Sequence, residues 1–211
     1  ENQVFGDASF LYKSVNDTYG GSLMLGIKKN KWMTKVRYSE QHFGDYRVPT
    51  DSIVYLTQRL PIHGKRMKNT AGYERDANWY TLYKGRRYEG DFYVSNAYQK
   101  VGFFPGAHGA PDASRLEDDG DHRNIDLPYS RVNHLKLTSG HKYSWDTFSL
   151  TWNVGYQNNH REEMSLFHTH YGNQTAPEKD SDKELAFTLH TISSSLFAKI
   201  YNSENWVHTV G

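Results

Sequence analysis

Residues 148–156 read Phe-Ser-Leu-Thr-Trp-Asn-Val-Gly-Tyr, so every second residue of this stretch is large and apolar. Because successive side chains of a strand point to opposite faces, this alternation predicts a strand with one apolar and one polar face. The same alternation recurs in residues 32–39 and 88–99, whereas helical periodicity is almost absent. The sequence therefore predicts an all-β fold.

Nine strands are expected, and the connections between them alternate in length. The strands are placed near 4–14, 18–29, 31–41, 68–83, 87–100, 130–143, 147–160, 184–200 and 204–211. Tight turns are predicted at 29–31, 84–86, 144–146 and 202–204, and long polar connections at 42–67, 101–129 and 161–183. An antiparallel up-and-down meander with short turns at one end and long loops at the other is typical of an outer-membrane β-barrel.

Two segments depart from this simple pattern. Residues 52–60 lie between Pro49 and Pro61 and form the one candidate helix, although Ile53 and Val54 are β-branched. In residues 185–200 the apolar positions change parity midway, and a β-bulge near His190 would explain the change.

The positions of the aromatic residues favour a membrane barrel over a soluble sandwich, because an alternating pattern alone fits both. Aromatic side chains gather near tight turns, where a membrane–water interface would lie, at Trp32, Tyr83, Tyr88, Trp145, Phe148, Tyr201 and Trp206. A second set lies toward the other strand ends, at Tyr38, Tyr73, Tyr98, Tyr129 and Tyr156. The expected strands, with about a dozen residues, are also longer than the usual five or six and suit a tilted crossing of a bilayer.

Composition excludes several functions. The 211 residues carry 25 Lys+Arg and 24 Asp+Glu, a balance that leaves no basic surplus for nucleic acid. The chain has no cysteine, a mean hydropathy of −0.83 and 15% aromatic residues, which is unlike an ordinary soluble core. No nucleophile elbow, phosphate loop or His-Glu-x-x-His motif occurs, and Glu162 and Glu163 would point to opposite faces of a strand. No enzymatic activity and no intrinsic cofactor are expected.

Three segments of the sequence resemble those of a known family. They are residues 101–109 (Val-Gly-Phe-Phe-Pro-Gly-Ala-His-Gly), 124–134 and 155–162. They resemble TonB-dependent outer-membrane receptors of the Bacteroidetes type. The resemblance implies that 1–211 is part of a 22-stranded transmembrane β-barrel in the outer membrane of a Gram-negative cell. It also implies a plug domain, not present in this chain, through which the TonB complex would drive uptake of a scarce small-molecule nutrient, with an iron-siderophore or haem as the expected cargo.

The long loops hold the candidate ligand residues. Aromatic and cationic side chains would stack on an iron-siderophore or pair with its anionic groups, or the aromatics would pack the loops against one another. A His-Thr-His-Tyr run at 168–171 offers haem ligands. The set is Phe103, Phe104, His108, Arg115, Arg123, Phe167, His168, His170 and Tyr171. Asp118, Asp119 and Asp121 are candidates for a hard cation, with a solvated acidic turn as the alternative.

Two other classes of protein remain open. A passive porin or a barrel adhesin would share the membrane strands without energy coupling. A soluble carbohydrate-binding β-domain would use Trp32, Trp79, Trp145 and Trp206 as platforms for sugar rings. The membrane hypotheses require outer-membrane lipid around the strands, whereas the soluble one requires a folded monomer in water.

Overall fold

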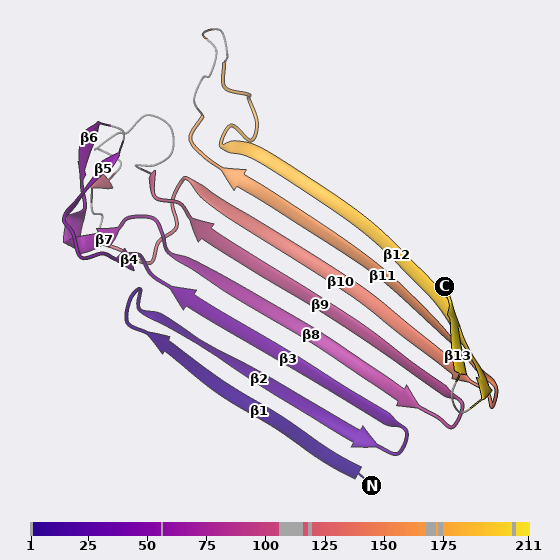
Figure 1. Cartoon of the computed structure of the whole chain (residues 1–211). Coiled ribbons are helices and arrows are strands. Elements are labelled where there is room, and N and C mark those ends of the chain that lie inside the picture. Colours follow the sequence, from indigo (N-terminus) through magenta and orange to yellow (C-terminus); the bar gives the residue numbers. More distant parts are fainter. Residues whose placement is uncertain are drawn as a thin grey trace.

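The computed structural model describes residues 2–55, 57–105, 116–117, 120–167, 172, 175–203 and 206–211. Within these ranges the chain forms one large antiparallel meander sheet of nine strands, in the order β1-β2-β3-β8-β9-β10-β11-β12-β13 (Figure 1). The strands are β1 (Asn2–Lys13), β2 (Thr18–Lys29), β3 (Trp32–Phe43), β8 (Gly72–Lys84), β9 (Tyr88–Gly102), β10 (Tyr129–Ser144), β11 (Phe148–Met164), β12 (Lys183–Ser203) and β13 (Trp206–Val210). The predicted all-β meander is confirmed, and its strand positions are correct within a few residues.

Two small two-stranded sheets lie beyond one end of the large sheet. They are the pair β4 (Tyr46–Arg47) and β7 (Arg66–Met67), and the pair β5 (Ser52–Tyr55) and β6 (Gln58–Pro61). A short 3-10 helix, η1 (His63–Lys65), connects β6 to β7. Figure 1 shows the two small sheets at the left, at the end where the long connections lie, while the tight turns lie at the opposite end.

The predicted helix at 52–60 is wrong. Ile53 pairs with Leu60 and Val54 with Arg59 across the β5–β6 hairpin. The β-branched side chains favour the extended backbone, and Pro61 is the last residue of β6, opposite Ser52, while Pro49 precedes the hairpin.

The predicted bulge near His190 is also wrong. Strands β11 and β12 pair without interruption from Glu163 opposite Leu185 to Phe148 opposite Ile200, and the irregularity lies between Glu163 and Met164. The change of parity therefore reflects a real change of face: Leu185, Phe187 and Leu189 lie on the face opposite to that of Ile192.

The apolar core of the described residues is small and does not lie on the large sheet. Its buried members are Leu60, Ile62, Phe104 and Leu116, which pack against partly buried Val48, Ile53, Tyr55 and Met67. These residues belong to the segment from β4 to β7 and to the connection after β9, so the core holds the long loops together. The large sheet has no covering layer among the described residues, and β1 and β13 are its edges.

Candidate functional site

One face of the large sheet is apolar and exposed. Because residues opposite one another on antiparallel strands point to the same side, the register connects Trp152 to His141 on β10 and to Leu196 on β12. Followed across all strands, it places Leu23, Val36, Trp79, Val94 and Leu137 on this same side, which we call the apolar face. Leu23, Val36, Trp152 and Leu196 are each 44–55% exposed. A soluble sheet would bury such side chains.

Several polar side chains of the apolar face bond to one another. The indole N–H of Trp79 donates to Thr34 Oγ1 at 2.8 Å, and that of Trp152 donates to Ser194 Oγ at 3.0 Å. His141 has a partner at each ring nitrogen, the Tyr88 hydroxyl at 2.8 Å and the Ser139 hydroxyl at 3.1 Å. These groups are satisfied without water, which is what a hydrocarbon environment requires.

A row of aromatic rings crosses the sheet near the tight turns. Consecutive ring centroids are 4.9 Å apart for Trp32 and Tyr83, 5.9 Å for Tyr83 and Tyr88, and 4.7 Å for Tyr88 and Tyr143. The row continues through Trp145, 6.0 Å from Tyr143, and Phe148, 4.3 Å from Trp145. We call it the turn-end row. It contains five of the seven residues predicted from sequence as an interfacial set and adds Tyr143. Tyr201 of the predicted set lies instead on the opposite face, where its hydroxyl is 3.2 Å from Ser149 Oγ.

A second row lies at the other end of the strands. The centroids of Tyr19 and His42 are 5.5 Å apart, those of His42 and Tyr73 are 5.5 Å apart, and those of Tyr73 and Tyr98 are 5.8 Å apart. We call it the loop-end row. Beside this row, the apolar face carries charged groups: Arg75 and Glu40 form an ion pair (2.8 Å), and the Tyr38 hydroxyl donates a hydrogen bond to Glu40 (2.5 Å).

The spacing of the two rows matches the apolar band of a membrane barrel. On β3, β8 and β9 the two rows are ten residues apart: Trp32 and His42, Tyr83 and Tyr73, Tyr88 and Tyr98. At about 3.3 Å per residue this is ~33 Å along a strand. A strand tilt of about 40° projects it to ~25 Å, the usual height of the band between aromatic girdles.

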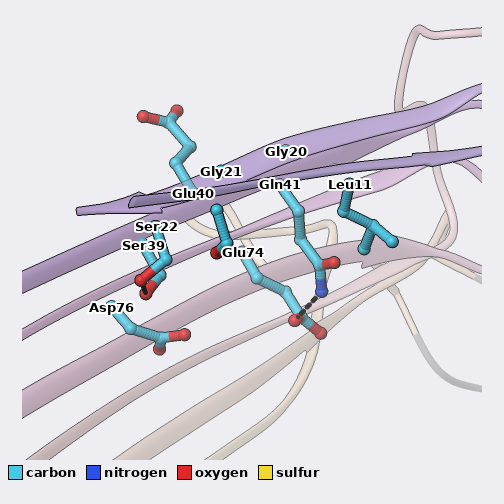
Figure 2. Close-up of a pocket in the computed structure, with 10 residues that line it drawn as sticks. Leu11, Gly20, Gly21, Ser22, Ser39, Glu40, Gln41, Glu74 and Asp76 are labelled. Carbon is cyan, nitrogen blue, oxygen red and sulfur yellow. Dashed lines mark hydrogen bonds between the residues drawn. The ribbon is translucent and has the colours of Figure 1, made fainter. Parts of the chain in front are cut away.

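The opposite face is polar and hollowed near β1–β3 and β8. Figure 2 shows a groove there in which Ser22, Ser39, Gln41, Glu74 and Asp76 gather, with Glu40 directed to the other side of the sheet. Glu74 accepts hydrogen bonds from the side-chain amides of Gln41 and Gln99. Nearby, Arg37 donates to Asp7 at 2.9 Å and to Ser22 at 2.8 Å. A wet, hydrogen-bonded surface of this kind suits the lumen of a barrel.

The β12 strand is an exception on the polar face. Phe187 and Leu189 point to that side and are 58% and 60% exposed. They explain why the alternation changes parity in the sequence.

Above the loop-end row, Asp17 joins three segments that are distant in sequence. Its carboxylate accepts hydrogen bonds from Arg66 at 2.6 Å and Arg47 at 2.9 Å, and His122 Nε2 lies 3.6 Å away. The Asp17 carbonyl accepts a hydrogen bond from Arg123 at 2.6 Å. The hydrogen bond from Arg66 lowers the pKa of the Asp17 carboxyl. Three guanidinium groups meet at Asp17: those of Arg47 and Arg66 bond to its carboxylate, and that of Arg123 bonds to its carbonyl.

Two buried polar residues fix the loops below this cluster. The Asn69 amide donates to the carbonyls of Phe103 (3.0 Å) and Pro128 (2.8 Å), and its oxygen accepts from the Asp126 N–H at 2.8 Å. Asp45 Oδ1 accepts the N–H groups of Thr70 and Ala71, while burial raises the pKa of its carboxyl. Sequence reasoning missed Asp17, Asn69 and Asp45. The one signal was turn chemistry, since Asp17 and Asn69 have positive φ values of 49° and 59°, which Asn and Asp tolerate.

The predicted ligand residues fall into four groups. Phe103 and Phe167 are 40% and 39% exposed, and Arg123 lies 5.0 Å over the Tyr19 ring. Phe104 is buried in the loop core, so it packs the loops, which was the alternative role for these aromatics. Asp121 accepts the backbone N–H of Arg123. The remaining residues, His108, Arg115, His168, His170, Tyr171, Asp118 and Asp119, lie outside the described residues.

Across the described part of the chain, no three His, Asp or Glu side chains gather as metal ligands would. In the same residues, no helix is long and apolar enough to cross a membrane. No protein-family model, curated protein or solved structure matches this chain.

Proposed function

We propose that the chain is a segment of a transmembrane β-barrel in the outer membrane, and that this barrel belongs to a TonB-dependent receptor for a scarce nutrient. The observation that carries the membrane part is the apolar face, which is exposed over the sheet and bounded by the turn-end and loop-end rows. Trp32 and Tyr98 are members of those rows, and their rings have an apolar face and a polar edge, as aromatic residues at a membrane–water interface do.

The open edges of the sheet support closure by further strands. In hydrocarbon, each unpaired backbone N–H or carbonyl costs several kcal/mol, so β1 and β12 need partners along their whole length. β13 pairs only with residues 198–203 of β12, which leaves Lys183–Phe197 with an unpaired edge among the described residues. A larger barrel, of the 22-stranded size that the resemblance implies, would supply those partners and enclose the polar face as its lumen.

The loop end supports capture of an anionic nutrient. Arg47, Arg66 and Arg123 surround Asp17, and the Arg47 side chain is 50% exposed. Exposed Phe103 and Phe167 would add stacking surface. Such a surface suits an iron-siderophore, whose chelating groups are anionic, better than a neutral sugar.

Fractionation of the source cells tests the membrane proposal. We expect an antibody against residues 120–128 to detect the protein in the outer-membrane fraction, as a band well above 24.5 kDa that migrates differently when heated before electrophoresis. A heat-insensitive band of 24.5 kDa in the soluble fraction would refute it and favour the carbohydrate-binding β-domain.

Growth under iron limitation tests the receptor proposal separately. A strain lacking the protein should lose uptake of a labelled iron-siderophore or haem, and uptake should also stop when the proton-motive force that powers TonB is collapsed. Uptake that continues after that collapse would instead identify a passive porin.

A further inference from the structure

We propose that the apolar face carries a specific site for one anionic membrane lipid, with phosphate at the loop end and an acyl chain along β8 and β9. This inference rests on the proposed membrane location. Two adjoining hollows carry it: an apolar one lined by Leu23, Leu25, Val36, Trp79 and Val94, and a polar one lined by Tyr73, Arg75, Tyr98 and Asn133. Both include Tyr38, Ala77 and Asn96, so they form a single groove.

The groove exists because a small side chain lies between large ones. Ala77 is directly opposite Tyr38 on β3 and Asn96 on β9. Its methyl group leaves room for a ligand between Tyr38 and Trp79. An acyl chain fits such a slot because the chain and the apolar part of the slot are both apolar, and because the slot opens toward the surrounding lipid.

The side chains that line the groove change from apolar to amide to cationic in successive rows toward the loop end. Trp79, Val94 and Leu137 form one apolar row across β8, β9 and β10. The next three rows toward the loops are Ala77, Asn96 and Leu135, then Arg75, Tyr98 and Asn133, then Tyr73, Lys100 and Arg131. From the first row to the last is ~20 Å along the strands, at about 3.3 Å per residue. The order apolar, amide, cation is the order of acyl chain, ester or amide linkage, and phosphate in a membrane lipid.

Unsatisfied groups in the groove match the polar parts of that lipid. Within the described residues, the side-chain amides of Asn96 and Asn133 have no hydrogen-bond partner. Asn133 lies level with Tyr98 in the loop-end row, whereas Asn96 lies one register step inside it, where an unpaired amide is costly unless a ligand bonds to it. Ester or amide groups of a lipid would do so.

The cations are available to a phosphate. Lys100 Nζ lies 4.1 Å from the Tyr129 ring centroid, and no described carboxylate pairs with it. Arg75 uses its Nε for Glu40 and stacks 4.8 Å over Tyr73, while its two Nη groups have no described partner. The guanidinium can therefore keep Glu40 and still donate to a phosphate oxygen.

Quenching of tryptophan fluorescence by brominated lipids tests the site. The intact protein is reconstituted with one tryptophan retained, either Trp79 in the groove or Trp152 on β11, and every other tryptophan replaced by phenylalanine. Phosphatidylcholine vesicles contain brominated phosphatidylglycerol in one series and brominated phosphatidylcholine in the other. We expect Trp79 to favour the anionic lipid about fivefold, the effect of roughly one cation near an anionic headgroup, and Trp152 to show no preference.

Matched variants identify the cations that cause the preference for anionic lipid. Lys100→Gln and Arg75→Gln should each reduce the preference at Trp79, whereas Lys136→Gln, which removes a cation from the polar face of β10, should not. Inorganic phosphate should leave the preference intact, because phosphate alone gains nothing from the groove. Loss of the preference in phosphate would mean that the cations bind phosphate alone, and would overturn the lipid site.

The two proposals fail in different ways. If both tryptophans are quenched equally by both lipids, the sheet is in the membrane and the lipid site is refuted. If neither tryptophan is quenched, the sheet is not in the membrane and the proposed function itself is refuted.

Discussion

Replacing Trp152 by arginine tests which face of the sheet meets lipid. Trp152 is four residues from Phe148 in the turn-end row, ~13 Å along the strand at about 3.3 Å per residue. With a tilt of about 40° this is ~10 Å into a band ~25 Å high, within a few Å of the midplane. Arginine at the midplane of a barrel costs about 2–4 kcal/mol.

The substitution also removes local contacts. The indole N–H of Trp152 bonds to Ser194 Oγ at 3.0 Å, and the ring stacks on His141 with centroids 5.4 Å apart. Trp152→Phe removes the hydrogen bond but keeps an apolar ring, so it should cost about 0.5–1.5 kcal/mol. The difference between the two variants isolates the cost of the charge.

Asn153→Arg is the matched control on the other face. Asn153 bonds to Ser195 at 3.3 Å on the polar face, so arginine there should cost no more than about 1 kcal/mol. Denaturant titration of the purified intact protein in lipid vesicles measures all three free energies of unfolding. We expect Trp152→Arg to lower the ratio of folded to unfolded protein by roughly 30-fold to 1,000-fold. Equal losses for Trp152→Arg and Asn153→Arg would refute the assignment of faces.

Three further predictions concern the loops. Phe104→Ala should lower the free energy of unfolding by about 3–5 kcal/mol because it opens the loop core, and faster proteolysis of the loops would detect this. Phe103→Ala, on the exposed side, should leave proteolysis unchanged and weaken iron-siderophore binding. Equal proteolysis of the two variants would contradict the assignment of Phe104 to the loop core. Asn69→Ala removes the amide's bonds to the carbonyls of Phe103 and Pro128 and takes away the acceptor of the Asp126 N–H, so it should cost about 1–3 kcal/mol in the same titration; a neutral result would show that these bonds do not stabilise the loops. Because Arg66 lowers the Asp17 pKa below its ordinary value of 3.8, the stabilisation by Asp17 should persist above about pH 4 and disappear as the pH falls further. Protease sensitivity measured against pH should show this acid transition in the wild type and not in Asp17→Asn, whose loops should be sensitive already at neutral pH.

The sequence by itself determined the nine strands, their order and most of the turn-end row. These features depend on local alternation and on turn residues, and Phe148, Leu150 and Trp152 show the period of two that distinguishes a strand from a helix. It failed at 52–60 and near His190. Prolines near both ends fit a helix and a hairpin equally well in the first case, and an apolar residue on a polar face looks like a slipped register in the second.

The tertiary structure alone decided what the loops and the groove contain. Asp17, Arg66 and Arg123 are separated by up to 106 residues, and no local pattern relates them. The burial of Phe104 beside exposed Phe103 is likewise set by the hairpin that packs on it. The lipid groove depends on register, because only the pairing of β3, β8 and β9 places Ala77 between Tyr38 and Asn96. Local periodicity fixes the face on which a side chain lies, whereas long-range pairing fixes its neighbours.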